Sequence, residues 1–484
     1  MPFDNTYARL PHHFYQKIAP TPVAAPQLIR LNTPLAQTLE LDLPETDQAL
    51  AALFSGNTLL DGMEPLAQAY AGHQFGHFVP QLGDGRALLL GEAVTGEGHR
   101  FDIQLKGSGR TRFSRGGDGR SPLGPVIREY VVSEAMHALG IPTTRALAMV
   151  TTGETVHRET PLPGAVMTRV ASSFLRVGTF EYFAARNNVD ALRQLAEYAI
   201  QRHYPEAAEA DNPYAAFFEA VCAAQAKLVA QWMCVGFIHG VMNTDNTTIS
   251  GETIDFGPCA FMDSYNPAQV FSSIDQQGRY AFNQQPLVVQ WNMGCLGGCL
   301  VPLLSQDETE ANAIGEQILG TLTPRFAEQY RKGLCAKVGL HTATDSDFAL
   351  TRELLSLMHQ DHVDFTVAFR TLCDCEDRAD SFTSLFDARE AIAAWVEEWR
   401  SRLKAQGNNK AERRHAMRAV NPAFIPRNHR IEEAIRAAED TGDFALTHRL
   451  IEILSNPFAD QPENSAYQEP PQPSQRVHQT FCGT

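Results

Sequence analysis

HGVMNTDN, residues 239–246, and TTISGETIDFG, residues 247–257, form the most informative stretch of the sequence. We expect the second segment to be a short hairpin that turns at Gly251 and sets Asn246 and Asp255 side by side. An amide oxygen and a carboxylate that converge on one point suit a hard cation such as Mg²⁺ or Mn²⁺. Asp-Phe-Gly alone is a weak motif, but HG and DN just upstream make an incidental surface hairpin the poorer interpretation.

This arrangement resembles the catalytic loop and the metal-binding DFG of protein kinases and of aminoglycoside kinases. In the small-molecule kinase pattern HGDxxxxN, an Asp two residues after the His is the base, whereas Val241 occupies that position here. Valine cannot accept a proton, so either the enzyme is inactive or another group serves. Asp245 is the candidate base, and its alternative role is to orient the substrate hydroxyl.

The chain upstream supplies groups suited to a nucleotide. Lys106 ends a predicted strand, DIQLK, where its ammonium group can neutralise phosphate. Its expected partner is a carboxylate on the following helix, which opens at Pro125. Glu129 and Glu134 both qualify, and we prefer Glu129 because it lies one turn into the helix. A lysine at a strand end is more often a solvated surface group, but the neighbouring motifs favour the ligand role here.

Glycine and arginine concentrate in the segments around this lysine. The turn at Gly83-Asp84-Gly85-Arg86 is compatible with close approach to a ligand, although it lacks the full GxGxxG pattern and is equally compatible with a tight hairpin. The loop 107–125 is polar and glycine-rich, as functional loops often are. We expect two to four arginines of the following set to bind phosphate. The set is Arg110, Arg112, Arg115, Arg120, Arg169 and Arg176.

The periodicity changes along the chain from strand-like to helical. Short alternating runs at 76–106 and 143–170 predict strands, and helical patterns at 190–203, 214–239 and in six segments beyond 305 predict helices. The fold class expected is α+β, a protein-kinase-like fold with two lobes. The predicted parts are an N-terminal extension (1–75), a kinase-like N-lobe (76–168), a helical C-lobe (169–460) and a flexible C-terminal tail (461–484).

The bulk composition limits the partners. The 484 residues carry 40 Lys+Arg against 56 Asp+Glu, a formal charge of −16, which argues against nucleic acid or an anionic membrane. The N-terminus lacks the basic start and apolar core of a signal peptide, and no apolar run approaches a bilayer span. Nine scattered cysteines suit a reducing compartment. We expect a cytoplasmic, monomeric protein.

The cysteines predict no metal site. Cys295 and Cys299 lie together in CLGGC, but neither a His nor a further Cys completes a zinc-site spacing around them. Buried small hydrophobic side chains are therefore the better interpretation of most cysteines in the chain.

The whole sequence resembles the selenoprotein O family, whose bacterial members are protein adenylyltransferases with a kinase-like fold. The resemblance covers nearly the full chain and is carried by six segments. These are FDNTYARLP, AGHQFGHFVPQLGDGRA, QLKGSGRTRFSRGGDGR, HGVMNTDN, DFGPCAFMD and QGRYAFNQQP. The family binds ATP in a flipped orientation, so that AMP is transferred to a protein hydroxyl. Neither the flip nor the choice of AMP follows from motif spacing.

The resemblance also implies roles at matching positions. Gly83, Gly85 and Arg86 contact the nucleotide, and Lys106 binds phosphate. Asp118 and Gly119 contact the adenosine part. Arg169 and Arg176 hold the distal phosphates, Asp245 accepts the proton, and Asn246 with Asp255 binds the metal.

The resemblance further implies a redox-active cysteine near the C-terminus and a link to redox homeostasis. Cys482 is the matching position, and a tail cysteine without a role is the alternative. No cysteine stands in the segment 270–273, VFSS, where a disulfide partner would be expected.

The function expected is metal-dependent transfer of AMP from ATP to Ser, Thr or Tyr hydroxyls of target proteins, with release of pyrophosphate. Two alternatives remain. A true kinase would use the same Lys, Asn and DFG residues. A pseudokinase, a nucleotide-binding module without transfer activity, is suggested by Val241.

Overall fold

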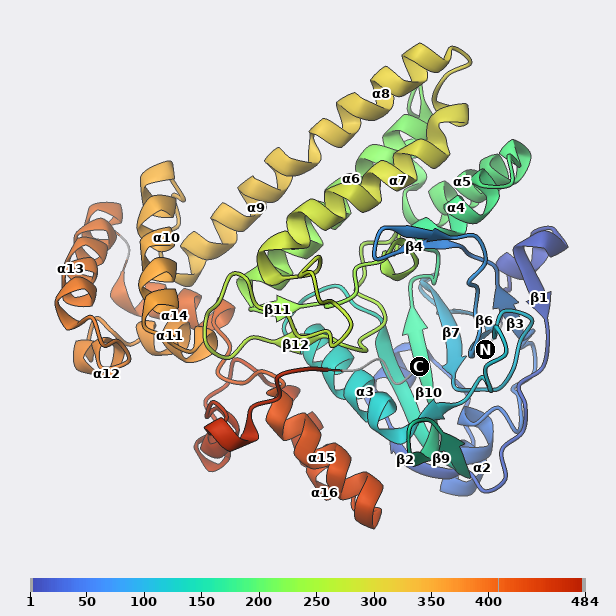
Figure 1. Ribbon diagram of the computed structural model, residues 1–484, viewed down its shortest axis with the longest axis horizontal. Helices are drawn as coiled ribbons and strands as arrows, with labels where there is room; N and C mark the ends of the chain where they lie inside the picture. Colours follow the sequence, from blue (N-terminus) through green and yellow to red (C-terminus); the bar gives the residue numbers. More distant parts are fainter. Residues whose placement is uncertain (1–2, 408, 481–484) are drawn as a thin grey trace.

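The computed structural model describes residues 3–407 and 409–480 of the chain. Figure 1 shows strands concentrated in the first third of the chain and helices in the rest, as the periodicity predicts. Helices α10 to α14 gather at one end of the molecule, away from the large sheet. Cys482 lies outside the described residues, so the structure does not test its predicted role.

The main sheet has eight strands, and every pair within it is antiparallel. The order along the sheet is β1-β3-β6-β7-β10-β9-β2, and β8 pairs with β10. The bounds of these strands are β1 (Tyr15–Lys17), β2 (Gln27–Leu31), β3 (Leu66–Gln68), β6 (Ala87–Val94), β7 (Arg100–Lys106), β8 (Ser121–Pro122), β9 (Arg145–His157) and β10 (Pro161–Ala171). Two small ribbons pair β4 (Gly72–Gln74) with β5 (His77–Val79) and β11 (Phe237–Ile238) with β12 (Ala260–Phe261).

The two faces of the sheet belong to two separate cores. Successive residues of a strand point to opposite faces. Accordingly Val166 packs with α1 (Thr33–Thr38) and α2 (Asp47–Phe54), whereas Met167 faces the larger core that includes α3 (Leu123–Ala138). That larger core continues from the sheet into the helical part. The sheet and the helices after it are therefore joined through one packed interior.

The helical part follows β10. Its members are α4 (Val177–Ala184), α5 (Val189–His203), α6 (Pro213–Cys234), α7 (Gln285–Leu304), α8 (Glu308–Gly320), α9 (Leu322–Lys337), α10 (Asp345–Gln360), α11 (Phe365–Leu372), α12 (Ala379–Thr383), α13 (Arg389–Gln406), α14 (Lys410–Val420), α15 (Asn428–Thr441) and α16 (Ala445–Leu454). The segment 282–304 around α7 is the one described helix long and apolar enough to cross a membrane, and more than half of it is buried inside the protein. The core helix of a globular protein meets the same criteria.

Several predicted elements differ from the structure. The segment 247–255 is not a regular hairpin, because Thr248 bridges to Arg176 and Thr253 bridges to Thr143 instead of pairing with each other. The glycine-rich turn at 83–85 does not join two paired strands, since β5 pairs with β4. Helix α3 begins at Leu123, two residues before the predicted Pro125, and α6 ends at Cys234, before the predicted residue 239.

The ends of the predicted domains also differ. Strands β1, β2 and β3 belong to the main sheet, so residues 1–75 are no separate extension in the described chain. The expected tail is packed down as far as Thr480. The Thr480 hydroxyl donates to the Pro258 carbonyl at 2.5 Å, and its backbone exchanges hydrogen bonds with Phe271 and Ser273. The tail thereby reaches the segment that follows Asp-Phe-Gly.

Candidate active site

A cavity of about 960 Å³ lies between the sheet and the helical part. Its lining contains every predicted nucleotide, metal and proton-transfer residue. These residues are Gly83, Gly85, Arg86, Lys106, Asp118, Gly119, Glu129, Arg169, Arg176, Asp245, Asn246 and Asp255. The loop arginines Arg110, Arg115 and Arg120 also line it. Residues from five separate segments therefore converge on one space.

Lys106 occupies the position expected at the end of β7. Its ammonium group is bonded to the carboxylate of Glu129, and it lies 3.3 Å from Asp255 Oδ1. Glu129 is buried on the second turn of α3. Glu134, the other carboxylate considered, binds Arg145 at 2.8 Å and Asn32 at 2.8 Å. The structure therefore pairs Lys106 with Glu129 and Arg145 with Glu134.

Three cationic side chains surround the Asp255 carboxylate. Arg169 Nη1 lies 2.6 Å from Oδ1, and Arg176 Nη1 lies 3.4 Å from Oδ2. Burial alone would raise the pKa of Asp255, but Arg169, Lys106 and Arg176 hold that pKa well below its usual range. Its backbone has a φ of +61°, which is uncommon for a residue other than glycine. Strained backbone of this kind concentrates at functional sites.

Arg176 contacts both Asp255 and the backbone of Asp245. Its guanidinium donates to the Asp245 carbonyl at 2.9 Å and to the Phe174 carbonyl at 3.2 Å, and it stacks on the Tyr70 ring at 4.3 Å. The side chain is 2% exposed, yet Nη2 has no hydrogen-bond partner in the described chain. A buried donor without a partner costs free energy, so it points to a ligand that completes the site.

Asp245 and Asn246 belong to one short 3₁₀ turn, residues 244–246. Asn246 Nδ2 donates to the Val241 carbonyl at 3.1 Å, which fixes the orientation of its amide. Asp245 Oδ2 accepts from Gln74 Nε2 at 3.1 Å, whereas Oδ1 is buried and has no partner among the described residues. Burial raises the pKa of Asp245 to about 7, against the opposing effects of Gln74 and Arg176.

Gly72 and Gly178 allow other segments to press against this turn. A Cβ on Gly72 would lie 2.5 Å from Asp245 Oδ1, and a Cβ on Gly178 would lie 2.1 Å from the Ala71 carbonyl. Strand β4 therefore packs against the Asp245 side chain, and the start of α4 packs against the Asp245 backbone.

The glycine-rich turn at 83–85 is held by the loop that follows β7. Gly83 has a φ of +73°, and a Cβ there would lie 2.3 Å from the Phe113 ring. The Thr111 hydroxyl donates to the Asp84 carbonyl at 2.6 Å, and the Ser114 hydroxyl donates to the Gly85 carbonyl. Glycine is required here by packing against the loop as well as by any approach of a ligand.

Arg158 is a residue of the site that sequence reasoning missed. It lines the cavity and binds the Asp118 carboxylate at 2.9 and 3.2 Å. The Arg158 hydrogen bond is the largest cause that lowers the pKa of Asp118. Among the loop arginines, Arg112 does not line the cavity, and Arg120 donates to the Thr21 and Pro22 carbonyls. Gln74 was also missed, because no local signal links it to Asp245.

His239 anchors the start of the same loop. It is fully buried, its Nε2 bonds the Ile254 carbonyl at 2.8 Å, and its ring stacks on Trp232. Burial lowers the pKa of His239 below its usual range, against the opposing effect of the Ile254 hydrogen bond. The folded protein therefore holds this imidazole neutral at a pH where the unfolded chain, with a pKa near 6.5, already binds a proton.

We expect the free energy of unfolding to fall as the pH drops below about 6.5, by up to about 1.4 kcal/mol per pH unit for this one proton. His239→Gln should reduce that slope by the contribution of this one proton, and the exposed His341→Gln should leave the slope unchanged. Burial also lowers the pKa of His203 to about 3 and that of His429 to about 4, so these two residues keep the rest of the dependence. Urea midpoints measured between pH 5 and 8 test the expectation. Parallel pH curves for His239→Gln and the wild type would contradict it.

The geometry of the cavity by itself defines a class of protein. The large cavity is lined by a lysine–glutamate pair, two buried arginines, Asn246 and Asp255. Such a set is typical of an enzyme that transfers part of a nucleotide or phosphoryl donor. The family model described as "Protein adenylyltransferase SelO" matches residues 1–455. The chain belongs to the SelO family and is a nucleotidyltransferase.

Curated relatives agree along the whole length. A protein of Maridesulfovibrio salexigens named protein nucleotidyltransferase YdiU is 58% identical over 100% of this chain and 98% of its own length. Proteins of the same name from Rhizobium johnstonii and Bradyrhizobium diazoefficiens are 57% and 56% identical over 100% of this chain, and the matches cover 97% and 99% of their own lengths. The resemblance inferred from the motifs is confirmed.

Proposed function

We propose that this enzyme transfers AMP from ATP to Ser, Thr or Tyr hydroxyls of target proteins. The hydroxyl oxygen forms a bond to the α-phosphorus, the bond to the β-phosphate oxygen breaks, and pyrophosphate leaves. The observation that carries the proposal is the convergence of Lys106, Arg169 and Arg176 on Asp255 in one cavity. Membership of a protein adenylyltransferase family supports AMP as the group transferred.

The fold that goes with this function is kinase-like, with the nucleotide between a sheet-rich and a helix-rich lobe. The Lys106–Glu129 pair corresponds to the strand-lysine and helix-glutamate pair of kinases. The joint cavity between the main sheet and the helical part supports the same assignment.

The phosphates bind the three cations around Asp255. Lys106 and Arg169 are each already bonded to Glu129, so the charge of both is fixed in place before the nucleotide binds. Arg176 offers a buried Nη2 without a described partner. Preorganised donors of this kind stabilise charge that develops on the leaving pyrophosphate.

The remaining contacts of the nucleotide are assigned to two loops. Gly83, Gly85 and Arg86 contact it from the turn before β6. Asp118 and Gly119 contact its adenosine part, with the Asp118 carboxylate positioned by Arg158. A Cβ on Gly119 would lie 2.1 Å from the Gly109 carbonyl, so the loop at this position tolerates only glycine.

The donor set fits a hard divalent cation. Asn246 uses its amide nitrogen on the Val241 carbonyl, which leaves its amide oxygen as the ligand atom, and Asp255 supplies a carboxylate. Both Mg²⁺ and Mn²⁺ are bound by oxygen ligands, so this donor set suits either ion. The cation, when bound, neutralises phosphate charge and polarises the phosphoryl group.

Asp245 is the group proposed to take the proton of the attacking hydroxyl. Asp245 lines the cavity beside Asn246, and its Oδ1 is buried without a described hydrogen-bond partner. Gln74 holds the other oxygen, Oδ2, and thereby fixes the carboxylate. Val241, at the position of the usual kinase base, lines the same cavity and has no acceptor atom in its side chain.

The setting proposed for the reaction is the cytoplasm, with a monomeric enzyme that binds neither nucleic acid nor membranes. The formal charge of −16 supports the exclusion of polyanionic partners. Target proteins are the expected partners.

Parallel reactions with α-labelled and γ-labelled ATP and a cell extract test the proposal. We expect protein-bound label from the α-position only, with mass spectrometry locating AMP on Ser, Thr or Tyr. Label from the γ-position would identify a kinase. ATP binding without transfer of either label, with Mg²⁺ or with Mn²⁺, would identify a pseudokinase. Either result would overturn the proposal.

A further inference from the structure

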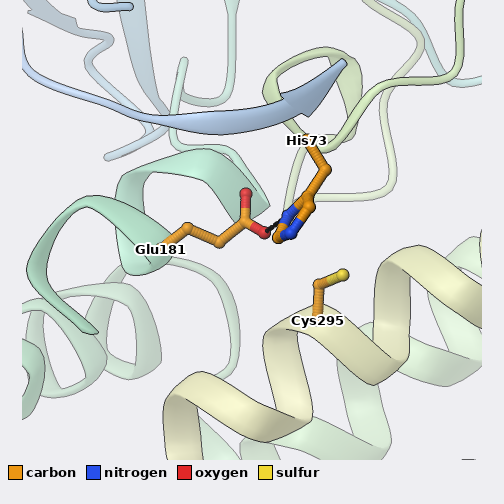
Figure 2. Close-up of side chains that lie close together, drawn as sticks. All are labelled: His73, Glu181 and Cys295. Carbon is orange, nitrogen blue, oxygen red and sulfur yellow. Dashed lines mark hydrogen bonds and ion pairs between the residues drawn. The ribbon is translucent and has the colours of Figure 1, made fainter. Parts of the chain in front are cut away.

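Three potential metal ligands meet beside the turn 244–246, which carries Asp245 and is called the catalytic turn below, and they lie outside the nucleotide cavity. They are His73 on β4, Glu181 on α4 and Cys295 on α7, and Figure 2 shows the three side chains directed toward one another. Their ligand atoms all lie within 4.8 Å of one another. None of the three lines the nucleotide cavity. The CLGGC segment, which lacks a metal partner in the sequence around it, obtains a histidine and a glutamate through the fold.

We propose that His73, Glu181 and Cys295 form a binding site for a soft or borderline transition-metal ion, Zn²⁺ being the best match. Imidazole, thiolate and carboxylate together are the ligand types of zinc sites, whereas Mg²⁺ and Mn²⁺ prefer oxygen. The site is therefore chemically distinct from the Asn246–Asp255 pair.

The distances are compatible with an ion after small movements. In a tetrahedral zinc site, ligand atoms lie roughly 3.3–3.6 Å apart, given the usual metal–ligand bond lengths. His73 Nδ1 and Glu181 Oε1 are 2.5 Å apart and share a hydrogen bond, so they must separate slightly. Cys295 Sγ must approach both. The His73 side chain is 26% exposed, which leaves an access path and room for a water ligand.

The surroundings orient the ligands. The His73 ring packs edge-on against Trp291 at 5.1 Å and against Phe78 at 5.0 Å. Glu181 Oε2 accepts a hydrogen bond from the Thr244 hydroxyl. Residues that hold ligands in this way raise metal affinity and are part of a functional metal site. Cys299 lies one helical turn beyond Cys295 and places a second sulfur on the same side of α7.

Binding must displace a proton from sulfur. Burial, and then the nearby Glu181 carboxylate, raise the pKa of the Cys295 thiol to about 12. The S–H bond breaks, the metal–sulfur bond forms, and the proton passes to solvent. Coordinating metals deprotonate thiols outright, so this pKa does not prevent binding.

The site is placed to stabilise the catalytic turn. Thr244, the residue before Asp245, donates its hydroxyl to Glu181. The same hydroxyl accepts a hydrogen bond from the His73 backbone N–H at 2.7 Å. The neighbour of His73, Gln74, holds the Asp245 carboxylate. An ion that joins β4, α4 and α7 therefore fixes three elements around Asp245.

The test uses full-length protein stripped with a chelator and titrated with Co²⁺, whose thiolate complexes absorb in the near ultraviolet. We expect a thiolate-to-cobalt band that saturates at one equivalent and is abolished by added Zn²⁺. Within residues 3–407 and 409–480 no cysteine lines the nucleotide cavity, so cobalt bound to those lining residues gives no such band. Zinc should also shift the urea midpoint of the wild-type protein upward.

Three variants make the assignment specific. Cys295→Ser should abolish the band, and His73→Gln should weaken cobalt binding at least about tenfold, in line with the loss of a metal-site contact. Cys234→Ser is the matched control, a free and half-buried cysteine on a neighbouring helix, and it should retain the band. Circular dichroism of each metal-free variant checks folding, and the partly exposed His73 position gives a second readout if Cys295→Ser unfolds. Absence of the band in the wild type, its persistence in Cys295→Ser, or its loss in Cys234→Ser would overturn the proposal.

Discussion

Asp255→Asn is expected to lower AMP transfer by on the order of 10²–10³-fold, the loss typical of removing one charge-stabilising group from an active site. The substitution keeps the shape of the side chain and removes the charge around which Lys106, Arg169 and Arg176 are arranged. It also removes a carboxylate ligand of the proposed cation. Initial rates with α-labelled ATP and one purified target protein measure the effect.

A matched control separates lost chemistry from lost folding. Asp263→Asn breaks a comparable contact, since Asp263 lies 2.6 Å from the buried Arg427 and outside the nucleotide cavity. We expect both variants to lose stability, because removing one partner of a buried ion pair costs up to about 3–5 kcal/mol. At an assay temperature where both variants remain folded, Asp255→Asn should lose AMP transfer and Asp263→Asn should retain it. Transfer by Asp255→Asn within tenfold of the wild-type rate would exclude the proposed role.

The centre of the site could be predicted because its residues carry local signals. Lys106 ends an alternating strand, and Glu129 follows at the right phase of a helix that has a proline and glycine at its boundaries. The Asn246 and Asp255 motifs are close in sequence. The order of the strand, the helix and the two motifs along the chain was enough to predict that these residues lie together. The structure places all of them around one cavity.

The segment 247–255 shows why an element with a correct position can have the wrong structure. The chain does reverse near Gly251, which has a φ of +77°. Its two arms nevertheless pair with Arg176 and Thr143, from segments 70 and more residues away. Local turn chemistry predicts a reversal, but competition from distant edges decides which backbone groups pair.

Helix α7 was missed for a different reason. Its sequence contains Gly297, Gly298 and Pro302, which favour a loop. A Cβ on Gly297 would lie 2.8 Å from the Phe218 ring, so glycine permits close packing of α7 on α6. A helix that stays apolar on its exposed side, as at Leu287 and Trp291, has no amphipathic period for sequence analysis to detect. Tertiary packing here overrides the propensity of the individual residues.

Long-range partners were beyond any local pattern. Arg158 reaches Asp118 across 40 residues, and Gln74 reaches Asp245 across 171. His73 and Cys295 are likewise far apart in the sequence and close together in the structure. The sequence carries no local signal for such pairs, because each partner alone resembles an ordinary surface or core residue.

Asp245→Asn is expected to lower kcat for AMP transfer by on the order of 10²–10⁴-fold with little change in KM for ATP, the range associated with loss of a general base. Asparagine retains a carbonyl oxygen that can accept the hydrogen bond from Gln74, so the position of the side chain is preserved. What disappears is the capacity to take a proton. Single-turnover rates with α-labelled ATP separate this chemical effect from nucleotide binding.

The comparison with Gln74→Met distinguishes proton transfer from orientation. That variant leaves the Asp245 carboxylate intact and removes only the 3.1 Å hydrogen bond that holds it. If Asp245 accepts the proton, Gln74→Met should cost less than about tenfold while Asp245→Asn costs at least a hundredfold, since general-base catalysis contributes that much. If Asp245 only orients the hydroxyl, an amide serves nearly as well as a carboxylate, and Asp245→Asn should retain most of the rate. Near-equal small losses in the two variants would therefore assign Asp245 to positioning.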